Sequence, residues 1–424
     1  MTDKLKMNFR LINWNIGGAK FLELPNKSDW DSDTNPNKKK PEMFRAEFKE
    51  NLHHAVEVLI RYIYKNAHVI TLQEVVQFHE DGDNKNPKNI FPESFFKELG
   101  YRFHFFPLID TQKFSAQAKW VKIKKNGYWN QNAYFAQGNA ILVKETMNLF
   151  PVWSIPKLDI KLEKYMEFRG AGVLNYRNEL ICRTKEEDAD SNQHITECSR
   201  EIEYASEKVF VEQGLYFGDR NTEPRAAIIT HIVLDGQITS NKKLKKPLDI
   251  FIVNLHLTTL QHEREGIPSI DEKGENRRLK QLDIVFNDII SRYNSWKQQK
   301  DYKLRDEEYP IIKEIETVNR HKPVWIVAGD FNFTPTSTEY QYIVKRNFIS
   351  LIKDDPPTKA KGLGKSPTLT VDYVFAGPLY YSIDPSDAKN RITNNRVESE
   401  NDQIKVSDHY PMLVQVPILV EEEG

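Results

Sequence analysis

The chain of 424 residues carries 60 basic and 61 acidic side chains, and its hydrophobic fraction of 39% is typical of a globular protein with a sizeable core. This near balance of charge disfavours a dedicated duplex-binding protein, because such proteins are often strongly basic, although a local basic channel stays compatible with it. Two cysteines cannot form a disulfide framework, no apolar run is long enough to span a membrane, and the polar N-terminus does not resemble a secretory signal. We therefore expect a cytoplasmic protein without stable membrane insertion.

The predicted elements begin with a strand over residues 9–16, in which apolar and polar side chains alternate. A polar loop follows at 26–40. An amphipathic helix is expected over 43–65, because its apolar residues recur at helical spacing, and a short strand over 68–72 comes next.

Further strands are predicted from short apolar runs at residues 138–143, 226–234, 248–257, 324–328, 372–376 and 411–416. One more amphipathic helix is expected between residues 257 and 324. Because many short strands are separated by few helices, the pattern indicates packed β-sheets rather than one parallel sheet.

Two stretches lack the pattern of the surrounding strands. Residues 113–135 interleave lysines with aromatic side chains, and residues 151–223 are charged and mixed in pattern. Since we find neither an internal repeat nor a clean linker, we expect one domain over 1–424, with insertions at 26–40, 113–135 and 151–223.

A recurring feature of the sequence is an apolar strand that meets a carboxylate, an amide or an imidazole at its end. Burying such groups without partners costs on the order of several kcal/mol each. They are tolerated if the strand ends converge on one edge, where the polar groups bind a cation and one another. The residues concerned are Asn15, Glu74, Asn254, His256, Asp330, Asn332, Asp372, Asp408 and His409.

The residue types in this set favour a hard, oxygen-bound cation. Mg²⁺ keeps several waters and usually needs one or two carboxylates from the protein, and Asn15, Glu74 and Asp408 fit that demand, with Mn²⁺ as a substitute. The sequence has no histidine and cysteine spacing of a zinc site, because His262 and Glu263 are followed by Gly266 where a second histidine would stand.

Several short motifs carry a resemblance to a known family. They are Trp14-Asn15-Ile16, Leu72-Gln73-Glu74-Val75, Gly138-Asn139-Ala140-Ile141-Leu142, Asn254-Leu255-His256-Leu257, Gly329-Asp330-Phe331-Asn332, Asp372-Tyr373-Val374-Phe375 and Ser407-Asp408-His409-Tyr410-Pro411. In this order, from near the first residue to near the last, they resemble the endonuclease/exonuclease/phosphatase superfamily of deoxyribonuclease-I-like metal-dependent phosphoesterases. The motifs at 329–332 and 407–411 are the most specific, and the others add support mainly by their order.

The resemblance implies an α/β (α+β) fold, a four-layer sandwich of two packed mixed β-sheets flanked by helices, with the active site at one sheet edge. It also implies that Glu74 is the chief metal ligand, with Asn15 and Asp408 near the same ion.

The resemblance further implies the roles of the remaining site residues. Asp372 would orient His409, while Asp330 and Asn332 would position or activate the attacking water. Whether Asp330 or His409 is the general base stays open. The substrate phosphate would be contacted by Arg225, Asn332 and His256.

The function implied is Mg²⁺-dependent hydrolysis of a phosphate ester by in-line attack of water. A nuclease or nucleotide phosphodiesterase is favoured, because the lysines and aromatic residues of 113–135 suit a nucleic-acid backbone and its bases, although a plain surface hairpin explains them equally well. The alternative is a phospholipid-headgroup or small-metabolite phosphodiesterase or phosphatase. An inactive binding module is the least favoured, since every metal and base position is retained. The substrate, exo- versus endo-cleavage, the role of 151–223 and the oligomeric state stay open.

Overall fold

The computed structural model describes the strands and helices of the chain together with the loops that join some of them. The residues described are 4–17, 55–60, 67–79, 93–110, 134–144, 175–176, 181–184, 196–204, 207–215, 227–234, 237–239, 242–243, 248–257, 268–291, 323–352, 354–360, 366–378, 395–397 and 407–421. The predicted insertions at 26–40 and 113–135 lie outside them, except for the first two residues of β4.

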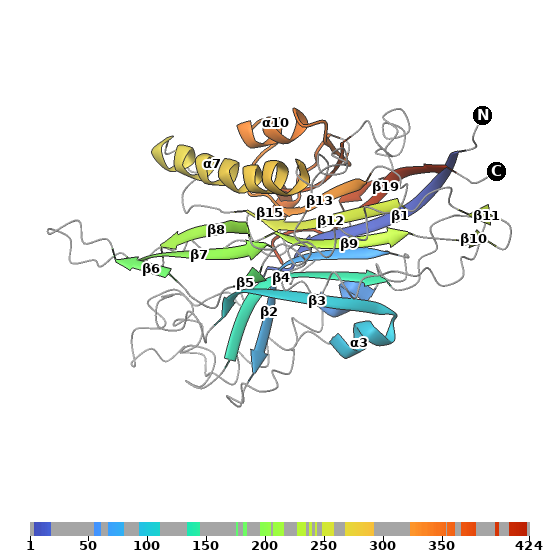
Figure 1. The fold of residues 1–424 in the computed structure, drawn as a ribbon, viewed down its shortest axis with the longest axis horizontal. Coiled ribbons are helices and arrows are strands. Elements are labelled where there is room, and N and C mark those ends of the chain that lie inside the picture. Colours follow the sequence, from blue (N-terminus) through green and yellow to red (C-terminus); the bar gives the residue numbers. More distant parts are fainter. Residues whose placement is uncertain are drawn as a thin grey trace.

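The first sheet has six strands in the order β18-β19-β1-β2-β4-β3 (Figure 1). Strand β1 pairs in parallel with β2 and antiparallel with β19, so the sheet is mixed. The strands are β1 (Lys4–Asn15), β2 (Val69–His79), β3 (Tyr101–Asp110), β4 (Tyr134–Lys144), β18 (Arg396–Val397) and β19 (Met412–Glu421). Strand β1 starts before residue 9, where we expected it, and β3 was not predicted.

The second sheet has five strands in the order β14-β17-β13-β12-β9 and is also mixed, because β12 and β13 are parallel and the other pairs antiparallel. Its strands are β9 (Ile228–Leu234), β12 (Leu248–His256), β13 (Val324–Asp330), β14 (Ile349–Ser350) and β17 (Asp372–Gly377). Every residue of β12 and β13 is buried, as expected for central strands that read as nearly continuous apolar runs.

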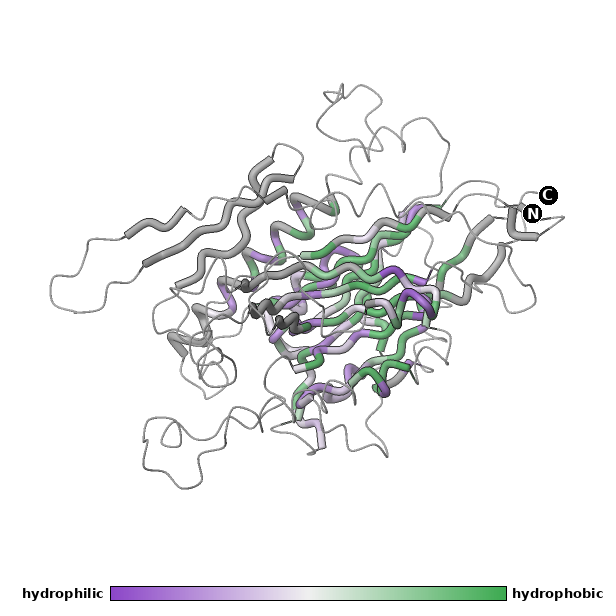
Figure 2. The backbone as a smooth tube through the Cα atoms, turned by 90° about the horizontal axis from the view of Figure 1, so that it is seen from below, coloured by the Kyte–Doolittle hydropathy of each residue, from purple (hydrophilic) through white to green (hydrophobic). Residues whose placement is uncertain are grey.

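The two sheets pack face to face around an apolar core, which Figure 2 shows as hydrophobic residues concentrated along the central strands. Side-chain amides also cross between the sheets. The Asn254 amide of β12 donates to the carbonyls of Leu72 and Ala140, at 2.9 and 2.8 Å, and Asn13 of β1 donates to the Gly329 carbonyl at 3.2 Å. These buried bonds fix the alignment of the two sheets where the strands end.

Helices cover both outer faces (Figure 1). On the second sheet lie α7 (Pro268–Asp283), its π-helical continuation η2 (Ile284–Ser291) and α10 (Thr338–Val344), while α3 (Glu93–Glu98) lies on the first. A buried salt bridge of 2.7 Å between Arg278 and Glu339 joins α7 to α10. The predicted four-layer sandwich is therefore confirmed.

Parts of both predicted helices lie among the described residues. Residues 55–60 of the helix expected over 43–65 are helical, and Leu59 packs in the same core cluster as Phe96 of α3.

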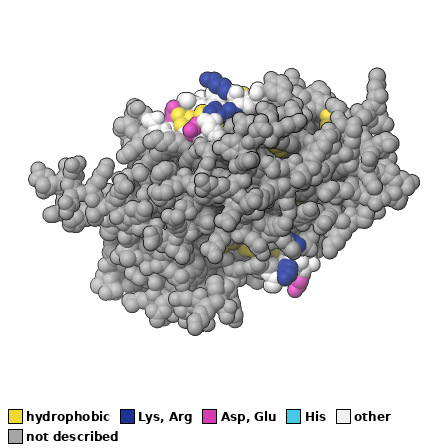
Figure 3. Space-filling view, in the orientation of Figure 1, with side chains coloured by type: hydrophobic (Ala, Val, Ile, Leu, Met, Phe, Trp, Pro, Cys, Tyr) yellow, Lys and Arg dark blue, Asp and Glu magenta, His cyan; other side chains and the backbone are white. Residues whose placement is uncertain are grey.

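No helix of the described residues is long and apolar enough to cross a membrane. In the view of Figure 3, the described side chains that reach the surface gather over α7, α10 and α3 and carry both charges.

The predicted insertion 151–223 contains four further strands, β5 (Asn175–Tyr176), β6 (Ile181–Thr184), β7 (Thr196–Tyr204) and β8 (Glu207–Leu215). They pair with one another, all antiparallel, in a sheet separate from the two of the sandwich. Short strand pairs also form between β10 (Gln237–Thr239) and β11 (Lys242–Lys243) and between β15 (Lys359–Ala360) and β16 (Pro367–Leu369).

Gly329 allows the close approach of β13 to β12 that the site requires. Its φ is +154°, and a Cβ added there would lie 2.0 Å from the Leu255 carbonyl oxygen of the neighbouring strand. We expect Gly329→Ala to lower the free energy of unfolding by about 3 kcal/mol, measured by urea denaturation. Gly100→Ala is the matched control, because Gly100 also has a positive φ of +77° but no atom within 4 Å of the added Cβ. Equal losses in the two variants would contradict this account.

Candidate active site

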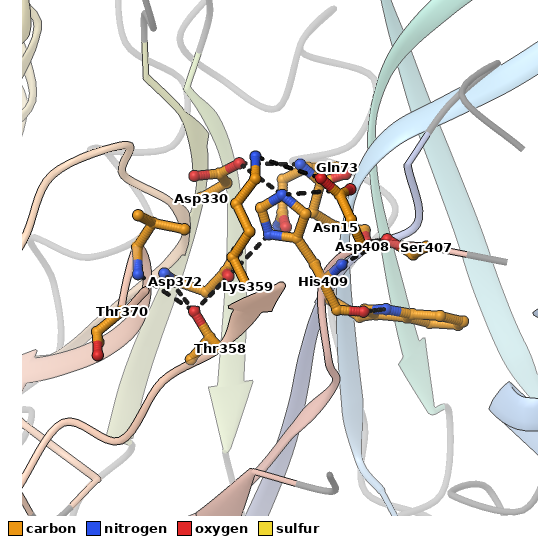
Figure 4. Close-up of polar contacts among 12 residues, drawn as sticks. Asn15, Gln73, Asp330, Thr358, Lys359, Thr370, Asp372, Ser407, Asp408 and His409 are labelled. Carbon is orange, nitrogen blue, oxygen red and sulfur yellow. Dashed lines mark hydrogen bonds and ion pairs between the residues drawn. The ribbon is translucent and has the colours of Figure 1, made fainter. Parts of the chain in front are cut away.

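Polar side chains from both sheets meet at one edge of the sandwich (Figure 4). Strand register explains the meeting: Asn15 lies opposite Gln73 in the parallel pair β1–β2, and Asp330 lies between His256 of β12 and Asp372 of β17. The cluster comprises Asn15, Glu74, His256, Asp330, Asn332, Asp372, Asp408 and His409, of which only Asp408 has a side chain more than 10% exposed. The structure thus brings together every predicted site residue except Arg225, which lies outside the described residues.

The Asn15 amide joins two carboxylates of the cluster. Its nitrogen donates to Asp330 Oδ2 at 2.9 Å and to Glu74 Oε1 at 3.4 Å, and its oxygen accepts from the Gly17 amide at 2.9 Å. His256 Nε2 lies 3.6 Å from the same Asp330 oxygen and 3.9 Å from the same Glu74 oxygen. Asn15 therefore holds Glu74 and Asp330 side by side, with the imidazole of His256 against both.

A line of three buried groups runs through His409. Its Nδ1 lies 2.8 Å from Asp372 Oδ2, and its Nε2 lies 3.7 Å from Asp330 Oδ2 and 3.8 Å from Asp408 Oδ1. Among the described residues, the buried Nε2 has no hydrogen-bond partner. The Asp372 carboxylate thus fixes the ring so that Nε2 is available for proton transfer at the centre of the cluster.

The environment of Asp372 changes its acidity. Burial raises the pKa of the Asp372 carboxyl above its ordinary value, and the charge of Asp330 adds to this, while the His409 imidazole and the Thr358 hydroxyl oppose it. Thr358 Oγ1 donates to Asp372 Oδ2 at 2.6 Å and accepts from the backbone amides of Val371 and Asp372. Thr358 therefore stabilises the ionised form that holds the imidazole.

Two site residues adopt strained backbone conformations. Glu74 has a φ of 55° and Asn332 a φ of 53°, in the left-handed region that residues other than glycine seldom occupy. Glu74 lies where the pairing of β2 with β4 shifts register between Leu72 and Val75, which is the pattern of a β-bulge. Such strain persists where surrounding contacts over-determine it, and it is concentrated at functional sites.

Hydrogen bonds from neighbouring residues hold both strained positions. Next to Glu74, the buried Gln73 amide donates to the side-chain oxygens of Asn13 and Asn254, at 2.9 and 2.7 Å. The Asn332 amide nitrogen donates to the Leu257 carbonyl at 2.9 Å, and its backbone N–H donates to Asp330 Oδ1 at 3.0 Å. The directions of Glu74, Asp330 and Asn332 are therefore set by the structure around them.

The cluster fits a bound divalent cation. Four carboxylates, those of Glu74, Asp330, Asp372 and Asp408, lie together with little access to water, and a cation would offset their repulsion. Within the described residues, ligand atoms of Asp330, Asp372 and His409 lie within 4.8 Å of one another. Because Asp372 and His409 are hydrogen-bonded to each other, we interpret them as an orienting pair and regard Glu74, Asp408 and Asp330 as the available oxygen donors.

Sequence analysis missed two residues beside the cluster, Thr358 and Lys359. They lie in the segment that pairs with residues 408–410, with backbone bonds from Ala360 to the Asp408 carbonyl at 2.7 Å and from Tyr410 to the Thr358 carbonyl at 2.8 Å. No strand pattern marks this segment, so its sequence gives no signal of the contact.

Replacing Thr358 with valine keeps the shape of the side chain and removes its hydrogen bonds to Asp372. We expect the free energy of unfolding to fall by about 1–3 kcal/mol, measured by urea denaturation. The pKa of Asp372 should rise further, because the lost hydrogen bond lowers it. Since only the ionised carboxylate stabilises a charged His409, the acid limb of the pH–rate profile should move to higher pH. Thr336→Val, at an exposed position, is the control, and an unmoved acid limb in Thr358→Val would contradict the assignment.

A comparison with protein-family models agrees with the motifs. Residues 289–409 match the family model described as Endonuclease/Exonuclease/phosphatase family. The matched segment contains Asp330, Asn332, Asp372, Asp408 and His409, so the resemblance seen in the sequence is confirmed for this part of the chain. A comparison with curated proteins gave no match.

Three similar solved structures share little sequence with this chain. The human Nocturnin catalytic domain with bound sulfate is 13% identical, with 98% of this chain and 96% of that chain covered and a TM-score of 0.37. Mannosyl-6-phosphatase Bt3783 of Bacteroides thetaiotaomicron is 11% identical, with 98% and 100% covered and a TM-score of 0.41. ANGEL2, a 2',3'-cyclic phosphatase, in complex with adenosine-2',3'-vanadate, is 14% identical, with 99% of each chain covered and a TM-score of 0.38. At these TM-scores the similarities carry no argument.

Proposed function

We propose that the protein is a Mg²⁺-dependent phosphoesterase that hydrolyses its substrate by in-line attack of water, starting from the match of residues 289–409 to the endonuclease/exonuclease/phosphatase family model. One observation carries the proposal: the buried line Asp372–His409–Asp330 meets Glu74 and Asp408 at a single edge of the sandwich. This arrangement combines a proton-transfer group with a set of hard oxygen donors.

The carboxylates of Glu74 and Asp408 would hold the cation, with Asn15 beside them. When bound, a divalent cation offsets the negative charge that develops on the phosphoryl oxygens and the leaving group. The side-chain nitrogen of Asn15 donates to Glu74 and Asp330 in this structure, so we expect Asn15 to orient these two carboxylates. To bind the cation directly, its amide would have to turn so that the side-chain oxygen faces the ion. Mn²⁺ should replace Mg²⁺, because both accept oxygen ligands.

The proton is handled on the His409 side of the cluster. In one arrangement Asp330 takes the proton of the attacking water while His409 stabilises the charge; in the other, His409 Nε2 takes the proton while Asp372 stabilises the imidazolium. Asp330 Oδ2 and His409 Nε2 lie 3.7 Å apart, so one water beside the pair would be within hydrogen-bond reach of either base. Asn332 would position this water.

The substrate phosphate would lie on the other side of Asp330. His256, at 3.6 Å from Asp330, is placed to contact a phosphoryl oxygen or the leaving oxygen. Asn332 and Arg225 are the further phosphate contacts that we propose from the sequence.

As substrate we propose a nucleic acid or nucleotide, on the basis of the lysines and aromatic residues of 113–135. A phospholipid headgroup or small phosphorylated metabolite is the alternative. The clustering of all the described catalytic candidates disfavours an inactive binding module. We retain a single domain over 1–424, its insertions and a cytoplasmic location as parts of the proposal.

The direct test is hydrolysis of bis(p-nitrophenyl) phosphate and p-nitrophenyl phosphate with Mg²⁺, Mn²⁺ or EDTA. We expect turnover with either metal and loss of turnover with EDTA, reversed by added Mg²⁺. Hydrolysis that survives EDTA, or no hydrolysis of any phosphate ester with either metal, would overturn the proposal. A panel of single- and double-stranded DNA, RNA, nucleotides and phospholipids then separates the substrate alternatives.

A further inference from the structure

Lys359 is held beside the cluster by its backbone. Its residue position pairs with that of His409 in an antiparallel bridge, between the bonds that tie Thr358 to Tyr410 and Ala360 to Asp408. The preceding residue, Thr358, binds the Asp372 carboxylate at 2.6 Å. The position of Lys359 relative to the cluster is therefore fixed from both sides.

The Lys359 side chain brings a positive charge to the edge where the carboxylates meet. Its Nζ lies 3.7 Å from Asp408 Oδ2, while the other oxygen of Asp408 lies 3.8 Å from His409 Nε2. Figure 4 shows the side chain directed toward the same edge as Asp330, Asp408 and His409. The Lys359 side chain is 17% exposed, so most of it is covered by the surrounding protein.

The contact between Lys359 and Asp408 is an ion pair and not a hydrogen bond. A distance of 3.7 Å is longer than a hydrogen bond, so no donor geometry locks the ammonium onto the carboxylate. A lysine ammonium is a compact charge on a flexible stem with three donors, and it can turn to a new anion without moving its backbone. A divalent cation on Asp408 would repel it, because two positive charges would then share one carboxylate.

We propose that Lys359 changes partners during the reaction cycle: it neutralises Asp408 in the metal-free protein and contacts a non-bridging oxygen of the substrate phosphate once the divalent cation is bound. This inference rests on the proposed function. It assigns Lys359, which lies 3.7 Å from Asp408, as a specificity-determining residue for phosphate esters.

The two halves of the exchange predict effects of opposite sign. Removing the ammonium in Lys359→Met removes the competitor for Asp408, so Mg²⁺ should bind more tightly. The same change removes a charged contact to the phosphate, so phosphate should bind more weakly. A residue with a merely structural role would weaken both or change neither.

The experiment measures the two affinities separately by calorimetry. Mg²⁺ is titrated into the full chain, and inorganic phosphate is titrated into the protein saturated with Mg²⁺. For Lys359→Met we expect Mg²⁺ to bind a few-fold more tightly and phosphate to bind about tenfold more weakly, since a hydrogen bond to a charged group is lost. Lys359→Arg should keep phosphate binding close to wild type, because it retains the charge. Lys345→Met, at an exposed lysine after α10, is the matched control and should change neither affinity.

The outcomes separate this inference from the proposed function. If wild-type protein binds no divalent cation at the cluster, the proposed function fails. If wild type binds both ligands but Lys359→Met leaves both affinities unchanged, or weakens both, the exchange is overturned while the function stands. Lys359→Gln repeats the test if the methionine variant does not fold.

Discussion

Replacing His409 with alanine should lower kcat by about 10²–10⁴-fold, the range typical of a lost proton-transfer group, while the fold stays intact. The side chain is the only one that reaches both Asp372 and Asp330 within the described cluster, at 2.8 and 3.7 Å. The backbone of residue 409 keeps its own bonds, because its carbonyl accepts from Trp14 and its amide donates to Ser407. The measurement is kcat on a phosphodiester reporter with Mg²⁺, beside the circular dichroism spectrum.

Asp372→Asn is a companion variant for this prediction. It keeps the volume of the side chain but removes the negative charge that stabilises a protonated His409. If His409 does not become fully protonated in the reaction, kcat should fall by less than in His409→Ala. Near-normal turnover by His409→Ala would count decisively against a catalytic role for the imidazole.

Glu74→Gln should weaken Mg²⁺ binding by about 100-fold or more, because one of the few carboxylates available to the cation is lost. The variant keeps the side-chain shape and an oxygen for the Asn15 amide, which now lies 3.4 Å from Glu74 Oε1. It also relieves repulsion between Glu74 and Asp330, which Asn15 holds side by side, so the metal-free protein should melt at a slightly higher temperature.

Calorimetry with Mg²⁺ and thermal melting in EDTA test both parts of this second prediction. Asp355→Asn is a suitable control, because this carboxylate bonds Tyr340 and Ser350 and takes no part in the cluster. Unchanged Mg²⁺ affinity in Glu74→Gln would show that the cation, if bound, uses other ligands.

The strand ends were the part of the site that the sequence predicted well. Apolar runs such as residues 324–328 show where a strand is buried, and the first polar residues after them mark its end. Parallel pairing of β12 with β13 then places His256 beside Asp330, and antiparallel pairing with β17 places Asp372 on the other side. Local periodicity and simple sheet geometry were sufficient for this step.

Contacts between loops and conformations outside the regular elements could not be predicted in this way. Lys359 and Thr358 reach the cluster because their backbone pairs with residues 408–410, a contact that no local pattern encodes. The positive φ of Glu74 follows from a register shift between β2 and β4, which depends on how the two strands meet.

Two groups of strands were missed for a different reason. Strand β3 (Tyr101–Asp110) alternates weakly, and its pairing with β4 shifts register between Pro107 and Ile109. In the predicted insertion, β7 (Thr196–Tyr204) has the sequence TECSREIEY, in which Arg200 interrupts the one set of alternate positions that would otherwise be free of charge.

The most direct test of the account is anomalous diffraction from a crystal grown with Mn²⁺. We predict one strong peak at the strand-end edge, with oxygens of Glu74 and Asp408 at about 2.1 Å and with Asp372 still bonded to His409 and not to the ion. A structure in which no ion binds there, or in which Glu74 and Asp408 are too far apart to share one, would contradict the central claim that these side chains form a single metal-dependent centre.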